Sequence, residues 1–148
     1  MNKNLLKYIF LFLSTHPILS KAELNESLPN DYTITFSGNT YHLSRRDRNE
    51  DNNIFGIRYK NVELFTLINS FENRAFALTF HKQWELNSFS NIGFRAGGVT
   101  GYTKEENSIQ LLGVTPVLAP TINFHHKKVG VEVSLQTDVL VFSLNYSF

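Results

Sequence analysis

Hydrophobic side chains recur at every second position along most of the chain, which is the period of a β-strand rather than of a helix. The last ten residues show this alternation most clearly, with one face formed by Leu140, Phe142, Leu144, Tyr146 and Phe148, and the other by Val141, Ser143, Asn145 and Ser147. A strand that faces lipid has an apolar outer face, while its inner face can be polar. The pattern therefore predicts that this segment is the closing strand of a membrane barrel.

Seven other segments carry strand signals, and no helical interval separates them. The first is expected to be a long strand from Tyr32 to Arg45 with a kink at Gly38, because a glycine inside a strand often marks a bulge. The sequence thus predicts an all-β fold, an eight-stranded antiparallel transmembrane β-barrel over residues 31–148, in which every backbone donor finds a partner. The remaining strands are expected near residues 55–59, 62–70, 75–84, 92–102, 111–124 and 129–136.

Two features of these strands bear on the wall and the interior of the barrel. Pro116 and Pro120 lie in the sixth strand and lack the amide hydrogen that a sheet ladder uses, so the pairing should be weakened there. The weak point could be a lateral opening or a bulge beside a turn.

Glu132 is expected to point into the lumen together with Arg58 and Arg95, because a carboxylate facing lipid would be costly. Such buried charges must pair with one another.

The first 22 residues are typical of a secretory signal peptide. A short basic segment precedes a mostly apolar stretch, Tyr8 to Leu19, and cleavage is expected after Ala22. The apolar stretch is shorter than the roughly 20 residues that a membrane-spanning helix needs. Residues 23–30 form a polar lead-in. Removal of residues 1–22 from the 148 leaves 126, which suits one domain of eight strands.

Composition agrees with a membrane barrel. Thirteen Phe and six Tyr against one Met suit strands and aromatic girdles better than helices. A formal net charge of +1 gives no reason to expect nucleic acid as a partner, and a chain without cysteine has no disulfide and no acylated cysteine. The terminal Phe148 resembles the closing signal of bacterial outer-membrane proteins, so the bacterial outer membrane is the expected location. Apolar outward faces on at least five strands argue against a soluble secreted barrel.

Three polar residues are expected at one rim of the barrel. If both termini lie in the periplasm, His42 is near the outer end of the first strand, and Asn69 and Ser70 are at the outer end of the third strand. Adjacent strands are roughly 4.8 Å apart, so the first and third strands lie within about 10 Å of each other. A histidine can remove the proton of a serine hydroxyl, and Asn69 or Glu50 could orient the imidazole. The alternative is that Asn69 and Ser70 are ordinary turn residues and that His42 is a hydrogen-bonded filler of the lumen.

Four segments resemble the PagP family of lipid A palmitoyltransferases in order and spacing. They are Tyr41 to Glu50, Ile68 to Phe71, Gly93 to Tyr102 and Val114 to Pro120. The resemblance covers most of the chain beyond residue 22 and implies an eight-stranded outer-membrane barrel that moves a palmitoyl chain from a phospholipid to lipid A. It also implies an apolar well that holds the acyl chain and substrate entry beside prolines. No metal or cofactor is needed for this reaction.

The essential histidine of that family matches His42, and its Asp-Ser pair matches Asn69 and Ser70, so an amide replaces the acid. Asparagine cannot stabilise imidazolium by charge, and the same exchange in a serine-protease triad lowers turnover by about 10⁴. Glu50 or Asp51 could supply the missing carboxylate. The first hypothesis is an acyltransferase with His42 as general base, Ser70 as nucleophile or hydroxyl donor and Asn69 as orienting group. It is expected to act as a monomer on a phospholipid donor and a lipid A acceptor.

Two other functions remain open. A non-catalytic small barrel that binds a lipid or another partner is favoured by Asn69 and by residues 23–30, which are shorter than the amphipathic helix of the family. A lipid A deacylase is suggested by His42, Ser44 and Glu50, which resemble the His-x-Ser motif and acid of the PagL family, although that motif belongs near the closing strands. The mass of lipid A distinguishes the three functions. An acyltransferase adds an acyl chain to lipid A, a non-catalytic barrel leaves lipid A unchanged, and a deacylase removes an acyl chain.

Overall fold

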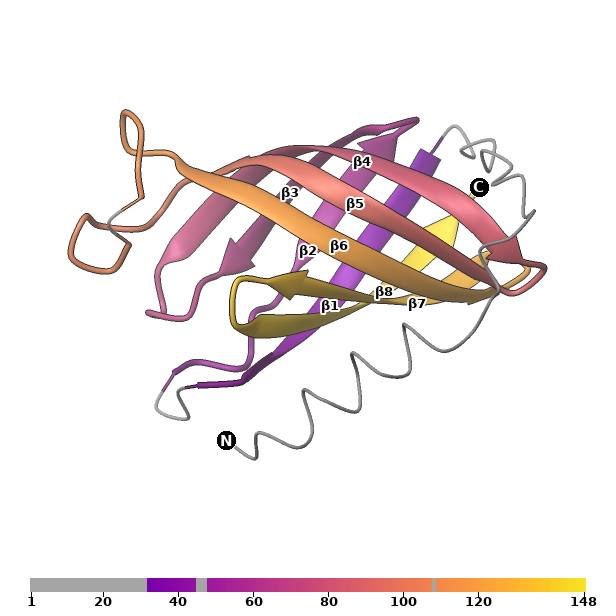
Figure 1. The fold of residues 1–148 in the computed structure, drawn as a ribbon, viewed down its shortest axis with the longest axis horizontal. Coiled ribbons are helices and arrows are strands. Elements are labelled where there is room, and N and C mark those ends of the chain that lie inside the picture. Colours follow the sequence, from indigo (N-terminus) through magenta and orange to yellow (C-terminus); the bar gives the residue numbers. More distant parts are fainter. Residues whose placement is uncertain (1–31, 45–47, 108) are drawn as a thin grey trace, which may run out of the picture.

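The computed structural model describes residues 32–44, 48–107 and 109–148. Eight strands pair in sequence order, and the last pairs with the first, so the sheet closes into an antiparallel barrel (Figure 1). This confirms the predicted all-β, eight-stranded fold. The predicted signal peptide and lead-in, residues 1–30, lie outside the described residues. The strands are β1 (Tyr32–His42), β2 (Phe55–Tyr59), β3 (Val62–Ile68), β4 (Arg74–Asn87), β5 (Ser90–Val99), β6 (Thr115–His126), β7 (Val129–Gln136) and β8 (Val139–Ser147).

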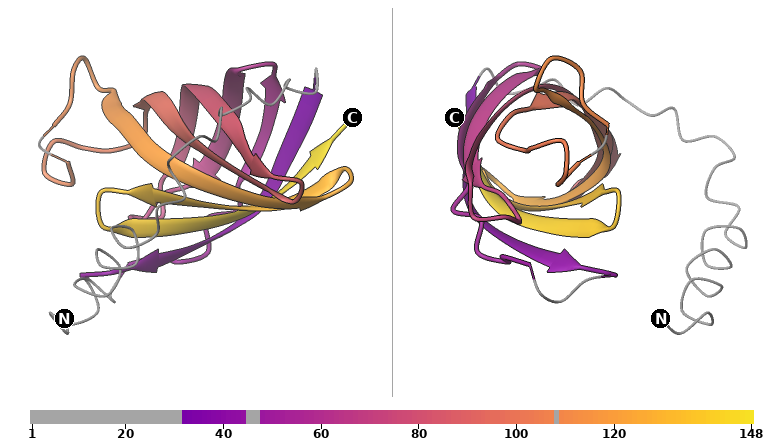
Figure 2. Two further views of the ribbon diagram at one scale, coloured as in Figure 1. Left: turned by 45° about the vertical axis from the view of Figure 1, so that its right-hand side comes forward. Right: turned by 90° about the vertical axis from the view of Figure 1, so that its left-hand side faces the viewer.

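The two ends of the barrel differ in the length of their connections. We call one end the short-turn rim, because tight turns join the strands there, at Lys60-Asn61, Ser88-Phe89 and Lys127-Lys128. The opposite end is the long-loop rim, which carries the connections that follow β1, β3, β5 and β7. In the end-on view of Figure 2, the loop between β5 and β6 lies in front of the barrel opening.

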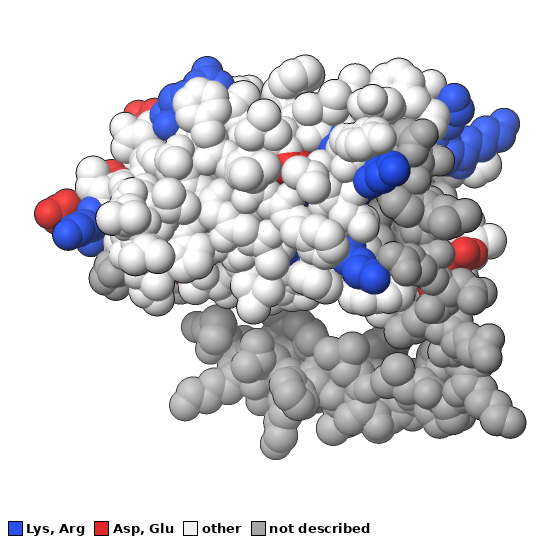
Figure 3. All heavy atoms as spheres, turned by 90° about the horizontal axis from the view of Figure 1, so that it is seen from above, with Lys and Arg blue, Asp and Glu red and all other residues white. Residues whose placement is uncertain are grey.

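The strands present apolar side chains outward and mainly polar side chains inward. On β8, Phe142, Leu144 and Tyr146 are exposed, and the side chains between them are buried. Threonine, serine, asparagine and charged residues dominate the buried set. Figure 3 shows that uncharged atoms cover most of the face seen there, with Lys, Arg, Asp and Glu mainly toward its ends. This distribution suits a lipid surround and a polar lumen. No helix in the described ranges is long and apolar enough to span a membrane.

Aromatic side chains form contacting pairs on the strand ends near the short-turn rim. The ring centroids of Tyr32 and Tyr59 are 4.9 Å apart, and those of Tyr146 and Phe148 are 5.2 Å apart. The ring centroids of Trp84 on β4 and Phe94 on β5 are 5.9 Å apart. Aromatic rings at one level around a barrel are typical of a membrane–water interface, because one part of each ring system is apolar while its edge tolerates water.

A bulge in β1 decides which way the end of that strand faces. Between Phe36 and Asn39, β1 contains one residue more than the facing part of β8, which confirms the predicted irregularity near Gly38. A side chain at Gly38 would collide with Ile54, so the chain approaches closely there. Even-numbered residues of β1 face outward before the bulge and inward after it. The extra residue therefore turns His42 into the lumen.

Several strands end at other residues than the sequence predicts. β3 ends at Ile68 rather than at Ser70, β4 runs to Asn87 rather than to Trp84, and β5 ends at Val99 rather than at Tyr102. β1 ends at His42 rather than at Arg45. β6 begins at Thr115 rather than at Leu111, because Leu111 makes a local bridge to Val114 instead of joining the ladder. The other predicted strands agree with the observed ones in order, and the outward and inward sets agree in facing.

The hydrogen-bonded wall is interrupted between β6 and β7. Their ladder starts at Thr121 and Ser134, so residues 115–120 of β6 have no β7 partner, although they remain paired to β5. Pro116 and Pro120 lie in that stretch, and the predicted weakening of the pairing is confirmed. The interruption reaches from the level of Thr121 to the long-loop rim.

Charged side chains cross the lumen in one connected network. Arg95 donates two hydrogen bonds to Glu63, of 2.7 and 3.2 Å, and one of 2.8 Å to Glu132. His81 lies 3.5 Å from Glu132, and Arg58 lies 2.7 Å from the other nitrogen of the His81 ring. The predicted pairing of inward charges is confirmed for Arg95 and Glu132, whereas Arg58 contacts His81 rather than a carboxylate. Glu63 is a partner that the sequence patterning did not single out. This network closes the lumen below the long-loop rim.

Candidate functional site

His42 and Ser70 meet inside the long-loop rim. His42 is the last residue of β1 and is 6% exposed, while Ser70 lies in the connection between β3 and β4. The Ser70 hydroxyl oxygen is 3.3 Å from Nε2 of His42. Which atom donates depends on the tautomer of the ring. With Nε2 unprotonated, the serine hydroxyl donates and the imidazole is placed to take its proton.

Asn69 shapes the turn that carries Ser70. The Asn69 side chain is fully buried, and its oxygen accepts hydrogen bonds from the backbone amides of Phe71 at 2.9 Å and Asn73 at 3.0 Å. Its side-chain nitrogen donates to the carbonyl of Gly101 at 2.7 Å, which ties the turn to the end of β5. Side-chain capping of a turn in this way is a common use of asparagine. Any orienting effect of Asn69 on the site therefore acts through the turn backbone.

The carboxylates near His42 have other partners. Asp51 accepts a hydrogen bond of 3.0 Å from Asn39, and Asp138 accepts one from Ser44. Glu50 is exposed, and its backbone carbonyl accepts from Thr40. Among the described residues, Ser70 is the side-chain partner of the His42 imidazole. The structure therefore places His42 and Ser70 as a pair, and no carboxylate of the described residues is bound to the ring.

A cavity of about 660 Å³ extends from this pair down to the charged network. Its volume lies in the ordinary range of small-molecule sites. Glu63 and Arg95 form part of its lining, and Pro116 and Leu118 border it beside the interruption between β6 and β7. Much of the wall between the two ends is apolar, formed by Ile54, Phe65, Leu67, Val99, Val117, Val139 and Val141.

Two further groups stand at the mouth of this cavity. The Arg48 guanidinium lies 3.9 Å from the ring centroid of Phe71, the residue that follows Ser70. Tyr102 packs edge-on against the same ring, with centroids 6.2 Å apart. Burial raises the pKa of the Tyr102 phenol above its ordinary value, and the nearby Glu106 carboxylate adds to the shift. The phenol therefore resists ionisation. Sequence patterning missed Arg48, because nothing in a charged loop marks one arginine among several.

No protein-family model and no curated protein matches the chain. Solved structures do match its fold. A de novo designed transmembrane β-barrel superimposes with a TM-score of 0.60 at 9% identity, over 83% of this chain and 99% of the designed one. A second design, TMB2.3, superimposes with a TM-score of 0.55 at 13% identity, over 82% of this chain and 97% of that one. The fold is therefore that of a transmembrane β-barrel, and the likeness extends to the fold alone.

Proposed function

We propose that this protein is an acyltransferase of the bacterial outer membrane that moves a fatty acyl chain from a phospholipid to lipid A. The observation that carries the proposal is the contact of 3.3 Å between Ser70 and His42 at the mouth of a cavity whose wall is partly apolar. The resemblance of the segments around these residues to lipid A palmitoyltransferases supplies the substrate class. The enzyme acts as a monomer, without a metal or cofactor.

His42 and Ser70 carry the chemistry in this proposal. His42 takes the proton of the Ser70 hydroxyl while the serine oxygen attacks the ester carbonyl of the phospholipid. The ester C–O bond breaks, and His42 passes the proton to the departing lysophospholipid oxygen. A hydroxyl of lipid A then gives its proton to His42 and attacks the serine ester, and the proton returns to Ser70. In a direct transfer, His42 instead activates the lipid A hydroxyl and Ser70 donates a hydrogen bond.

Asn69 and Arg48 position the reactants. Asn69 holds the turn of Ser70 through its three hydrogen bonds to backbone groups. Arg48 is a fixed cation at the mouth, where the phosphate of a lipid would lie once its acyl chain enters the cavity. The acyl chain lies against Phe65, Leu67 and Val117, and it removes apolar surface from water.

The interruption between β6 and β7 is the proposed path of the lipid. A phospholipid in the bilayer reaches the cavity sideways, past residues 115–120, without lifting its acyl chain through water. Pro116 and Pro120 keep this side free of ladder hydrogen bonds to β7. Their presence favours a lateral opening over a plain bulge, because β7 leaves a whole stretch of β6 unpaired.

Mass spectrometry of lipid A tests the proposal. Cells that produce the protein are expected to contain lipid A with one added acyl chain, and His42→Ala and Ser70→Ala are each expected to abolish the addition. Heat-dependent mobility on gels checks that both variants still form barrels. Full transfer by both variants would remove this mechanism. Intact-mass detection of an acylated Ser70 separates the two-step course from direct transfer.

A non-catalytic, lipid-binding barrel is the second candidate. It is favoured by the site itself, because the His42 ring contacts no carboxylate among the described residues. The same cavity would then hold a lipid chain without reaction. Unchanged lipid A in producing cells, together with a lipid that copurifies with the wild-type barrel, would favour this candidate.

A further inference from the structure

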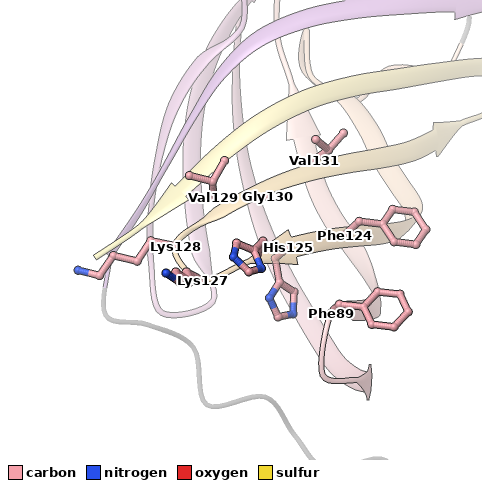
Figure 4. Close-up of a pocket in the computed structure, with 9 residues that line it drawn as sticks. Phe89, Phe124, His125, Lys127, Lys128, Val129, Gly130 and Val131 are labelled. Carbon is pink, nitrogen blue, oxygen red and sulfur yellow. The ribbon is translucent and has the colours of Figure 1, made fainter.

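A second hollow lies on the outer wall at the short-turn rim, at the far end of the barrel from His42 and Ser70. It has a volume of about 780 Å³ and is lined by residues of the β4–β5 turn, the end of β6 and the start of β7. Figure 4 shows the rings of Phe89 and Phe124 pointing the same way, with Val129 and Val131 on the adjacent strand. The proposed acyl transfer makes no use of this hollow.

The wall of the hollow nearer the middle of the barrel continues the lipid-facing surface. Phe124 and Val131 form a cross-strand pair between β6 and β7, and both are exposed. Phe89 is exposed in the adjoining turn, and its carbonyl accepts a hydrogen bond of 2.9 Å from the amide of His125. These side chains stand where the barrel meets the interface, so lipid chains lie directly against them.

The edge of the hollow at the short-turn rim is basic. His125, His126, Lys127 and Lys128 follow one another along the end of β6 and the turn to β7, and all four line the hollow. No acidic residue is part of the lining within the described residues, and neither lysine forms an ion pair there. Within the described part of the chain, the two lysine charges beside the apolar wall therefore have no acidic partner.

We propose that this hollow binds an anionic phospholipid, with the headgroup phosphate at Lys127 and Lys128 and the acyl chains against Phe124 and Val131. Charge complementarity selects an anionic headgroup over a zwitterionic one. The apolar wall selects a lipid over free phosphate, because it removes acyl chains from water together with exposed aromatic surface. The bound lipid would belong to the periplasmic leaflet, which follows from the proposed outer-membrane location. The binding site itself does not depend on acyl transfer.

Native mass spectrometry of the detergent-solubilised protein tests the site. Phosphatidylglycerol and phosphatidylcholine with identical acyl chains are offered in competition, and the bound ratio is measured for the wild type, K127Q and K128Q. The preference for phosphatidylglycerol is expected to fall about five-fold in each variant, the equivalent of about 1 kcal/mol per lysine. Excess inorganic phosphate is expected to leave the bound lipid in place.

Lys60 provides a matched control. It opens the β2–β3 turn of the same rim with φ 54°, as Lys127 opens the β6–β7 turn with φ 54°, but it does not line the hollow. K60Q is therefore expected to keep the wild-type preference. Equal losses in K60Q and K127Q, no preference in the wild type, or displacement by inorganic phosphate would each overturn the proposal. None of these results depends on whether lipid A gains an acyl chain.

Discussion

Ser70 lies 3.3 Å from Nε2 of His42, although 28 residues separate them in the sequence. The contact depends on the bulge in β1, because without its extra residue His42 would face lipid. It also depends on Asn69, which holds the turn of Ser70 against the end of β5. A strand irregularity and a buried amide together place a base and a hydroxyl at one mouth of the barrel.

If His42 and Ser70 act as one unit, their substitutions should not add. His42→Ala and Ser70→Ala are each expected to lower acyl transfer at least about 100-fold, and the double variant should lose little more than either single one. Transfer of a labelled acyl chain to lipid A measures all three. Ser44→Ala is the control, since Ser44 lines the same cavity but bonds to Asp138. A large loss in Ser44→Ala alone would show that Ser44 rather than Ser70 supplies the hydroxyl.

Introduction of an acid at residue 69 is expected to impair the protein. In Asn69→Asp, the group that donates to the Gly101 carbonyl is lost, and a carboxylate faces that oxygen inside a fully buried turn. An unsatisfied buried acceptor costs about 1–3 kcal/mol. Proteolysis of the β3–β4 connection should become faster and acyl transfer slower. An increase in transfer would show that the carboxylate reaches His42 after all.

Closing the interruption between β6 and β7 should block lipid entry. P120C with L135C would place a disulfide one step beyond the last cross-strand pair, in a chain that has no native cysteine. Oxidation is expected to abolish acyl transfer, and a reductant should restore it. I122C with V133C, which lie opposite each other within the ladder, is the control and should stay active when oxidised. Persistent activity of the first pair after oxidation would exclude this path.

The two arginines of the charged network should contribute unequally to the free energy of unfolding of the barrel. Arg95→Met leaves Glu63 and Glu132 buried without their shared cation, which is expected to cost about 3–5 kcal/mol. Arg58→Met should cost less, because Arg58 bonds to His81 and Thr33 rather than to a carboxylate. Urea unfolding in lipid vesicles, followed by the fluorescence of the single tryptophan, measures both. The opposite order would contradict this account of the network.

Alkaline pH should loosen the loop that carries Tyr102. The pKa of its phenol is raised above 10.0 in the folded state, so the folded loop resists ionisation that the unfolded loop allows. Stability from this group is therefore complete below about pH 10 and is lost as the pH rises through the folded value. Tyrosinate absorbance should show one late-titrating group that Tyr102→Phe removes. A wild-type curve that Tyr102→Phe leaves unchanged in shape would contradict the shift.

The fold can be predicted from the sequence because the alternation of apolar and polar residues within each strand indicates it locally. Alternation such as that of Leu140 to Phe148 states which face of a strand is apolar, and a chain of this length with such strands has few ways to satisfy its backbone other than an eight-stranded barrel. Pro116 and Pro120 likewise mark missing hydrogen bonds wherever they stand. Only the strand ends were misjudged, as at Leu111, where a local bridge competes with the ladder.

The tertiary structure alone decided which polar groups meet. His42, Asn69 and Ser70 could be placed at one rim from topology, but the distance from His42 to Ser70 and the hydrogen bonds of Asn69 arise only when distant strands close on each other. The partners Glu63 and Asp138 and the basic hollow at Lys127 depend in the same way on register around the barrel. Period-two patterning tells inside from outside, whereas closure of the sheet sets which inward side chains face one another across the lumen.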